Sequence, residues 1–526
     1  MEKSENPHRE IRKVLVANRG EIARRIIRAV HALGKEAVAV YAGPDRDLPH
    51  VEEADEAWSL GEGTLARTYL NGAHLLEIAR QSGADALHPG YGFLSENAGF
   101  AAECRKAGLV FIGPDPDSIA HMGEKVAARD RARALGIPVP EGFSGTLSEL
   151  REQAPHLPYP VLIKPSAGGG GKGMRIVHRA SDLIREAEES AREARNYFGS
   201  DLLLVEQYLP SPRHVEVQVL GDRHGNLVHL FERDCSLQRR YQKIIEEAPS
   251  PTLSGPTREK MTAAALELAR DIGYVGANGG VWWMAFLFTA EMGTRIQVEH
   301  PVTETVTGID LVQEQIRIAE GPAAFLCPAG HPDPGPPIEA RVYAEDPLAG
   351  FLPSPGGWSQ WRNHPLTVSD RQRVPGKEPR GKRNRSWSPG NVVHGSTPGT
   401  GTHRFAGLGL YRIAGPRTNR DFLVPSCKPR NSGKPPSTRP FWTASWRGWP
   451  RIAGPAGAGA REPGSPPRCP GQPKVPRTRG HRHVPSLLPP EPGMCCQAAE
   501  FCPGCDWIGK KTYIRFGAEE NGAFGS

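Results

Sequence analysis

Residues 291–304 read EMGTRIQVEHPVTE, a stretch in which charged and amide side chains alternate with aliphatic ones. In an extended strand, side chains two residues apart share one face. Arg295, Gln297 and Glu299 would then lie together on a polar face, opposite a core face of aliphatic residues. The pattern predicts a strand that carries a polar site, and the alternative is an edge strand with a solvated charged face.

A glycine-rich loop lies upstream, between two predicted strands. Residues 161–165 (VLIKP) lead into SAGGGGKGM at 166–174, and RIV follows at 175–177. Successive glycines let backbone N–H groups close around phosphate oxygens, and Lys164 and Lys172 add positive charge. A P-loop would need Gly-Lys-Ser/Thr at the start of a helix, which this stretch lacks. The pattern favours a phosphate-binding loop over its alternative, a flexible hairpin.

The N-terminal part alternates predicted strands and helices. A buried strand over 14–17 is followed by the turn NRGE and a helix from Ile22 to about Leu33, and the next strand covers 38–41. The turn lacks the three spaced glycines of a dinucleotide fingerprint, so NAD is not assigned to it. Further strands are expected at 84–87 and 110–112, and a helix over about 117–135. This order predicts a doubly wound parallel sheet of about 120 residues.

Two charged runs lie farther along, at 214–220 (HVEVQVL) and 232–243 (ERDCSLQRRYQK). The first alternates polar residues with Val and Leu, which predicts a strand with one polar face. Antiparallel strands with a charged face could form the floor of a site for an anionic ligand. The alternative reading, favoured for such charges taken alone, is a solvated surface.

The charge of the 526-residue chain is split between its two ends. From Gly357 onward there are 27 Lys and Arg against 9 Asp and Glu, or +18, which leaves −11 for the remainder of a chain whose net charge is +7. No run of about 18 apolar residues indicates a membrane span. The polar start lacks the pattern of a secretion or transit signal. The three widely spaced cysteines before residue 357 suit reduced thiols. A cytoplasmic protein is expected.

The residues resemble the biotin carboxylase component of biotin-dependent carboxylases, within the ATP-grasp superfamily. Nine stretches carry the resemblance in family order: 16–28, 88–97, 164–177, 206–209, 214–218, 232–249, 291–308, 339–347 and 351–356. The resemblance implies a pre-ATP-grasp N-terminal domain, an ATP-grasp domain and a β-rich C-terminal domain. It also implies ATP-dependent carboxylation of biotin, in which bicarbonate attacks the γ-phosphate of ATP and the resulting carboxyphosphate delivers CO2 to the biotin ring.

The resemblance assigns roles residue by residue. For catalysis it implies Glu299 as the base for bicarbonate, Arg295 and Lys243 as cations near the transferred groups, and Arg341 as the stabiliser of the biotin enolate. For ATP and bicarbonate it implies the following set: Lys125, Lys164, Gly168, Gly169, Gly170, Gly171, Lys172, Gly173, Met174, Glu206, Leu209, His214, Gln238, Gln297 and Val298. Phosphoryl transfer mostly needs positioning and neutralised charge, which lysines and Mg2+ (or Mn2+) provide.

The sequence departs from the family at the metal site. Residues 277–290 contain no acid where the family places a metal-binding glutamate, so only Glu291 remains as a metal ligand. Beyond residue 356 the apolar periodicity gives way to Pro, Arg, Gly and Trp. We hypothesise that shifts of reading frame around 278–290 and after 356 produced both departures. Cys495, Cys496, Cys502 and Cys505 lack the regular spacing of a zinc site.

These observations predict four regions: an N-terminal domain over 11–123, an ATP-grasp domain over 124–333, a partial C-terminal domain over 334–425, and a disordered tail over 426–526. No biotinylation motif occurs, so the expected partners are a separate biotin carboxyl carrier protein, a carboxyltransferase subunit and a second copy in a homodimer, without membrane or specific nucleic acid. The alternatives are a catalytically impaired ATP-binding remnant and another ATP-grasp ligase.

Overall fold

The computed structural model describes residues 9–123, 125–166, 173–198, 202–210, 212–239, 242–284, 287–321, 337–343, 345–349 and 351–353, with short strands at 360–362, 390–394 and 412–414. No helix within these ranges is long and apolar enough to cross a membrane. The glycine-rich segment 167–172 and the cysteines near residue 500 fall outside the described residues. The same holds for the whole of the expected tail over 426–526.

The N-terminal sheet is parallel in every pairing, with the order β3-β2-β1-β4-β5. Its strands are β1 (Lys13–Val16), β2 (Glu36–Tyr41), β3 (Glu56–Ser59), β4 (Ala86–His88) and β5 (Val110–Phe111). The doubly wound parallel sheet predicted from the sequence is therefore confirmed. Strand β3 was missed because EAWS is short and mostly exposed, without the apolar run of a buried strand.

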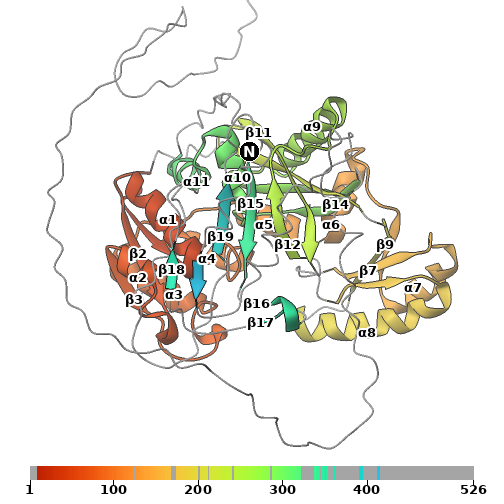
Figure 1. Ribbon diagram of the computed structural model, residues 1–526, viewed down its shortest axis with the longest axis horizontal. Coiled ribbons are helices and arrows are strands. Elements are labelled where there is room, and N and C mark those ends of the chain that lie inside the picture. Colours follow the sequence, from red (N-terminus) through yellow and green to blue (C-terminus); the bar gives the residue numbers. More distant parts are fainter. Residues whose placement is uncertain are drawn as a thin grey trace, which may run out of the picture. The chain divides into compact units, whose positions relative to one another are not determined.

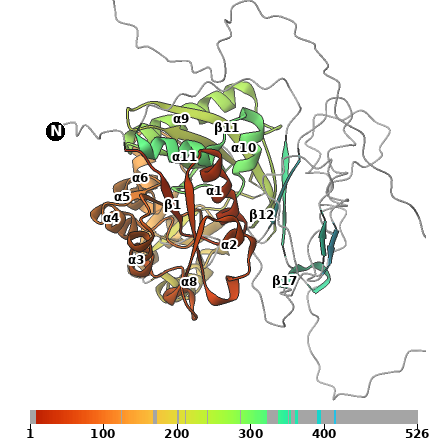
Figure 2. The same ribbon diagram turned by 90° about the vertical axis from the view of Figure 1, so that its left-hand side faces the viewer.

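Helices cover both faces of this sheet (Figure 2). On one face Val14 and Val16 pack with α1 (Gly20–Ala32) and with α11 (Leu311–Glu320). On the other, Leu15 and its neighbours pack with α3 (Gly72–Ser82), α4 (Ala98–Lys106) and α5 (Pro116–Gly123). The helix expected over 117–135 is two helices, because α5 ends at Gly123 and α6 (Lys125–Ala134) begins anew.

A four-stranded antiparallel sheet follows, with the order β6-β9-β7-β8. It comprises β6 (Gly142–Gly145), β7 (Val161–Pro165), β8 (Arg175–Val177) and β9 (Leu203–Gln207), with helices α7 (Leu147–Gln153) and α8 (Ala180–Phe198) packed on it (Figure 1). Strands β7 and β8 pair in the register Val161↔Val177. The two strands predicted on either side of the glycine-rich segment are thus confirmed, and they pair with each other.

The third sheet has seven strands in the order β14-β13-β10-β11-β12-β15-β19. These are β10 (His214–Gly221), β11 (Leu227–Arg239), β12 (Gln242–Glu247), β13 (Gly276–Met284), β14 (Leu287–Met292), β15 (Ile338–Val342) and β19 (Gly390–His394). Helix α9 (Gly255–Asp271) packs on it, and α10 (His300–Thr307) follows β14. Every pairing in this sheet is antiparallel.

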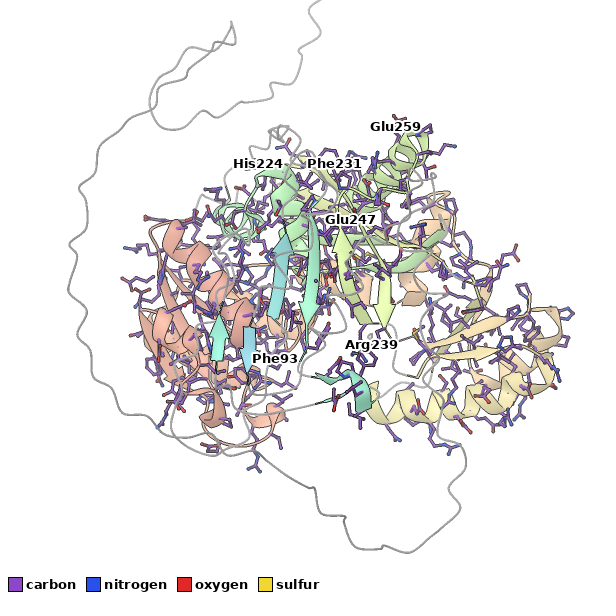
Figure 3. All side chains as sticks on the ribbon, viewed as in Figure 1. Phe93, His224, Phe231, Arg239, Glu247 and Glu259 are labelled. Carbon is purple, nitrogen blue, oxygen red and sulfur yellow. The ribbon has the colours of Figure 1, made fainter. Side chains whose placement is uncertain are left out.

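A small hairpin lies at the end of β11. Strands β16 (Glu345–Asp346) and β17 (Leu352–Pro353) form it. Arg239, the last residue of β11, donates to both carboxylate oxygens of Glu345, at 2.6 Å to Oε2, and its guanidinium lies 4.4 Å from the ring centre of Phe351. Figure 3 places Arg239 at this point beside the hairpin. The contacts fix the chain just beyond β15.

Candidate active site

Glu299 lies at the start of helix α10, where it is the N-cap residue and almost fully buried. The strand predicted over 294–299 is wrong. Strand β14 ends at Met292, and the following residues form an irregular connection up to the helix. His300-Pro301 begins that helix with proline in its first turn, a position that suits the fixed φ of proline.

The three polar residues of this stretch consequently do not share one strand face. Arg295 pairs with Glu96 at 3.2 Å in a partly exposed contact, whereas Gln297 and Glu299 are buried. The Gln297 side-chain nitrogen has no hydrogen-bond partner within the described ranges. A buried amide without a partner is costly and is free to bind a polar ligand.

Two cations from neighbouring strands meet the Glu299 carboxylate. The Lys243 ammonium, from β12, donates to Oε1, and Nη2 of Arg341, from β15, lies 2.6 Å from Oε2. Strands β12 and β15 are hydrogen-bonded neighbours, so the backbone register sets the spacing of the two cations. The structure therefore brings three of the four predicted catalytic residues together, whereas Arg295 pairs with Glu96 instead.

A second carboxylate, Glu216 on β10, extends the cluster. Its Oε2 accepts from Lys243 at 2.6 Å, and its Oε1 accepts from Nε of Arg233 at 2.6 Å. Arg233 stands opposite Glu216 in the β10–β11 register and also donates to Gln218 and Thr303. All of these groups except the partly buried Lys243 are buried. The interpretation that the charged runs at 214–220 and 232–243 form a solvated surface is therefore wrong.

These contacts set the protonation of the cluster. Burial and Glu216 would raise the pKa of Glu299, but Lys243 and Arg341 hold that pKa below its ordinary value. Burial would also raise the pKa of Glu216, yet Arg233 and Lys243 hold it well below the ordinary value. The pKa of Lys243 is raised, because nearby anions outweigh the effect of burial. Both carboxylates are thus ionised at neutral pH, and Glu299 can accept a proton.

The buried thiol of Cys235 completes this group. Burial, followed by Glu216, raises the pKa of Cys235 well above its ordinary value, so the thiol stays protonated. Ligand atoms of Glu216, Cys235 and Glu299 lie within 4.8 Å of one another, a spacing that a metal ion could bridge. The Lys243 ammonium contacts both carboxylates of this group, however, and supplies the positive charge. We assign no metal to it.

The residues present do not supply the carboxylate ligands that a pair of Mg2+ ions needs. Strand β13 contributes no acid between Gly276 and Met284, and the carboxylates of Glu216 and Glu299 are already paired with cations. Glu291 lies on β14, but its side chain is outside the described residues. A single carboxylate is a weak basis for phosphate-bridging Mg2+.

Four of the predicted ATP-binding residues form two pairs, one on β7 and β9 and the other on β10 and β11. The Lys164 ammonium lies 2.6 Å from Oε2 of Glu206, across neighbouring strands. Gln238 approaches Nδ1 of His214 at 3.1 Å, and Nε2 of His214 lies 3.8 Å from Glu216. His214 thereby connects Gln238 to the cluster around Glu299.

The remaining predicted residues are only partly described. Gly173 has a positive φ of 72°, and Met174, Leu209 and Val298 are half-buried. Gly168, Gly169, Gly170, Gly171 and Lys172 lie outside the described residues, as does the side chain of Lys125.

Sequence reasoning gave no role to Glu216, Arg233 or Cys235. A signal for Glu216 was present in HVEVQVL, because a glutamate that alternates with valines lies on the polar face of a predicted strand. Nothing in the local sequence indicates that Glu216 and Arg233 pair, because that pairing depends on the register of two strands.

Comparison with family models defines the class of protein. Residues 10–119 match the model "Biotin carboxylase, N-terminal domain", and residues 124–324 match "Carbamoyl-phosphate synthase L chain, ATP binding domain". Together with the sheets and the charged site, these matches define an ATP-grasp enzyme.

Relatives narrow the assignment. Biotin carboxylase 2 of Bacillus subtilis is 47% identical over 352 residues, which cover 65% of this chain and 79% of that protein. The methylcrotonoyl-CoA carboxylase alpha subunit of Glycine max is 49% identical over 363 residues, 67% of this chain. This chain belongs to the biotin carboxylase family. It spans about half the length of the methylcrotonoyl-CoA carboxylase subunits, 49% for the soybean protein.

Solved structures agree with this membership. The biotin carboxylase domain dimer of Hydrogenobacter thermophilus 2-oxoglutarate carboxylase, in complex with MgADP, ADP and bicarbonate, superposes with a TM-score of 0.73 at 39% identity, covering 80% of this chain and 94% of that one. A biotin carboxylase complex from Campylobacter jejuni gives 0.73 at 36% identity, covering 80% and 95%.

Proposed function

We propose that this chain carboxylates biotin on a carrier protein, with ATP and bicarbonate as substrates, as the biotin carboxylase component of an acyl-CoA carboxylase. The observation that carries the proposal is the buried Glu299 carboxylate between Lys243 and Arg341. A base needs to be ionised and within reach of its proton, and two adjacent cations suit a site that handles bicarbonate and phosphate. A relative's structure with MgADP and bicarbonate supports the same substrates.

In this proposal Glu299 deprotonates bicarbonate, which then attacks the γ-phosphorus of ATP. ADP leaves, and the resulting carboxyphosphate breaks down to phosphate and CO2. The released phosphate takes the proton of the biotin ureido N–H, and that nitrogen bonds to CO2. The Lys243 ammonium faces the transferred phosphoryl group, and the buried amide of Gln297 lies three residues before the start of α10, where it can hold bicarbonate. Arg341 stabilises the biotin enolate, since a guanidinium keeps its charge.

The predicted ATP site would use Lys125, Lys164, Glu206, Leu209, His214 and Gln238 with residues 168–174, and Val298 would join Gln297 and Arg295 at bicarbonate. Glu291 is the one remaining candidate ligand for the Mg2+ or Mn2+ expected with ATP. We propose domain limits of 11–123, 124–333 and 334–425. A carboxyltransferase subunit and a second copy of this chain are the further proposed partners.

The test is bicarbonate-dependent ADP release with free biotin. Wild-type chain should release ADP only when ATP, Mg2+, bicarbonate and biotin are all present. Glu299→Gln keeps the size of the side chain but cannot accept the proton, so ADP release should fall by roughly 100-fold or more. Equal rates in the two proteins would contradict the assignment of Glu299.

A second candidate, a catalytically impaired ATP-binding protein, is favoured by the acid-free strand β13. Thermal shift with ATP, with and without Mg2+, separates the two. An ATP shift without turnover under any condition selects the impaired protein. Biotin-independent ADP release that requires another carboxylate would select a different ATP-grasp ligase.

A further inference from the structure

Two buried glutamates face each other beneath the Glu299 cluster. Glu246 on β12 stands directly opposite Glu339 on β15, and both are 0% exposed. Directly opposed residues of an antiparallel pair project to the same face, with Cβ atoms about 5 Å apart. Arg341 lies two residues beyond Glu339, on the same face of β15. The two carboxyls and the guanidinium therefore share one buried surface of the sheet.

The carboxyls of this surface outnumber the charges that could balance them. Nε of Arg341 lies 2.6 Å from Oε1 of Glu246, and the same guanidinium pairs with Glu299. No side-chain oxygen of Glu339 or Glu246 accepts a hydrogen bond in the part of the chain that the structure describes, so the contact between Glu246 and Nε of Arg341 is an ion pair. An ionised carboxylate buried this deeply without a partner is strongly destabilising. Protonation removes that cost.

Other titratable groups face the pair from α1, from the start of α10 and from the pair's own strands. Glu21 on α1, Glu299 before α10, Lys243 on β12 and Tyr343 after β15 all interact electrostatically with one or both members. With Glu216 and Arg233 included, the surroundings hold three cations and three carboxyls, and the pair itself adds two more carboxyls, an excess that bound protons have to balance.

The protonation of the two members agrees with this count. Burial raises the pKa of Glu246 to about 7, against the opposing effect of Arg341. Burial, and then the charge of Glu246, raises the pKa of Glu339 well above its ordinary value. Two facing carboxyls in such a site titrate as a pair.

We propose that Glu246 and Glu339 share one proton and act as a positioning pair, which holds the Arg341 guanidinium where it reaches Glu299. With one proton, the pair carries a single negative charge that anchors Nε and leaves Nη2 for Glu299. If both members were ionised, two carboxylates on one face would compete with Glu299 for the guanidinium. The role assigned to Arg341 rests on the proposed function, whereas the shared proton does not.

Infrared spectroscopy of the full chain tests the shared proton without any turnover. At neutral pH the wild type should show C=O stretches of buried carboxylic acids, from this pair and from Glu21, that disappear at alkaline pH. Glu339→Gln leaves Glu246 as a single carboxylate beside Arg341, so the part of the signal that comes from the pair should be lost. Glu21→Gln identifies the part that comes from Glu21 and should keep the part that comes from the pair. A titrating signal in Glu339→Gln equal to that of the wild type would overturn the proposal.

The pH profile of bicarbonate-dependent ADP release tests the positioning role. Gln keeps the size and the neutral state of a protonated glutamate, so kcat/KM of Glu339→Gln should exceed that of Glu339→Ala by roughly tenfold. The activity of Glu339→Gln should also decline less at alkaline pH than that of the wild type. Equal losses and identical profiles in the two variants would indicate a packing role and overturn the positioning pair. A wild type without turnover would contradict the proposed function alone, and the infrared result would still decide the shared proton.

Discussion

Arg25 on α1 should stabilise the protein far more than an exposed arginine with a similar ion pair. Its guanidinium is 3% exposed and lies 2.7 Å from Glu304 and 2.6 Å from Asp310. Asp310 is partly exposed and also caps α11, but the Glu304 side chain is 2% exposed. Arg25→Ala leaves that carboxylate buried without this counter-ion, so the free energy of unfolding should fall by about 3–5 kcal/mol.

Urea unfolding followed by circular dichroism measures the loss as a lower midpoint at unchanged slope. The control is Arg151→Ala, which removes a pair of 3.0 Å whose arginine is 62% exposed and should cost at most about 1 kcal/mol. Adding Glu304→Gln to Arg25→Ala removes the unpaired charge and should recover part of the loss. Equal losses in Arg25→Ala and Arg151→Ala, or no recovery in the double variant, would refute the reasoning.

Two further results are expected from single substitutions. Burial raises the pKa of Glu21 to about 8, so the native protein holds a proton that the unfolded chain releases above about pH 4.5. The free energy of unfolding should therefore fall by up to about 1.4 kcal/mol per pH unit between these two values. Urea titrations at several pH values should show that the stability of Glu21→Gln depends less on pH than that of the wild type. Gly142→Ala places a Cβ against the Val205 carbonyl of the paired strand and should lower the thermal midpoint, whereas Gly255→Ala meets nothing within 4 Å and should leave it near wild type.

Much of the architecture could be predicted because apolar runs and turns are local signals. The strands at 14–17 and 161–165 stand out as buried segments bounded by Gly or Pro, and both are present. Element limits were less secure: the strand expected at 84–87 covers 86–88, and one expected helix is two.

The candidate site was harder to predict, because its charges meet only after long-range pairing. The alternation over 294–299 suggested a strand, yet the chain there turns into a helix, and Glu299 meets Lys243 and Arg341 from other elements. Nothing in the local sequence indicates that Glu246 and Glu339 are buried. Their burial follows from a register between strands more than 90 residues apart in the chain.

The seven-stranded sheet has a practical consequence for shortening this chain. Strand β12 is bonded on one side to β15, which begins at Ile338, beyond the expected boundary at residue 333. A protein truncated at that boundary would expose the backbone N–H and C=O groups of β12 along an open edge, which invites pairing with other molecules and aggregation. It would also lose the guanidinium of Arg341, so a fragment meant to isolate nucleotide binding should extend past β15.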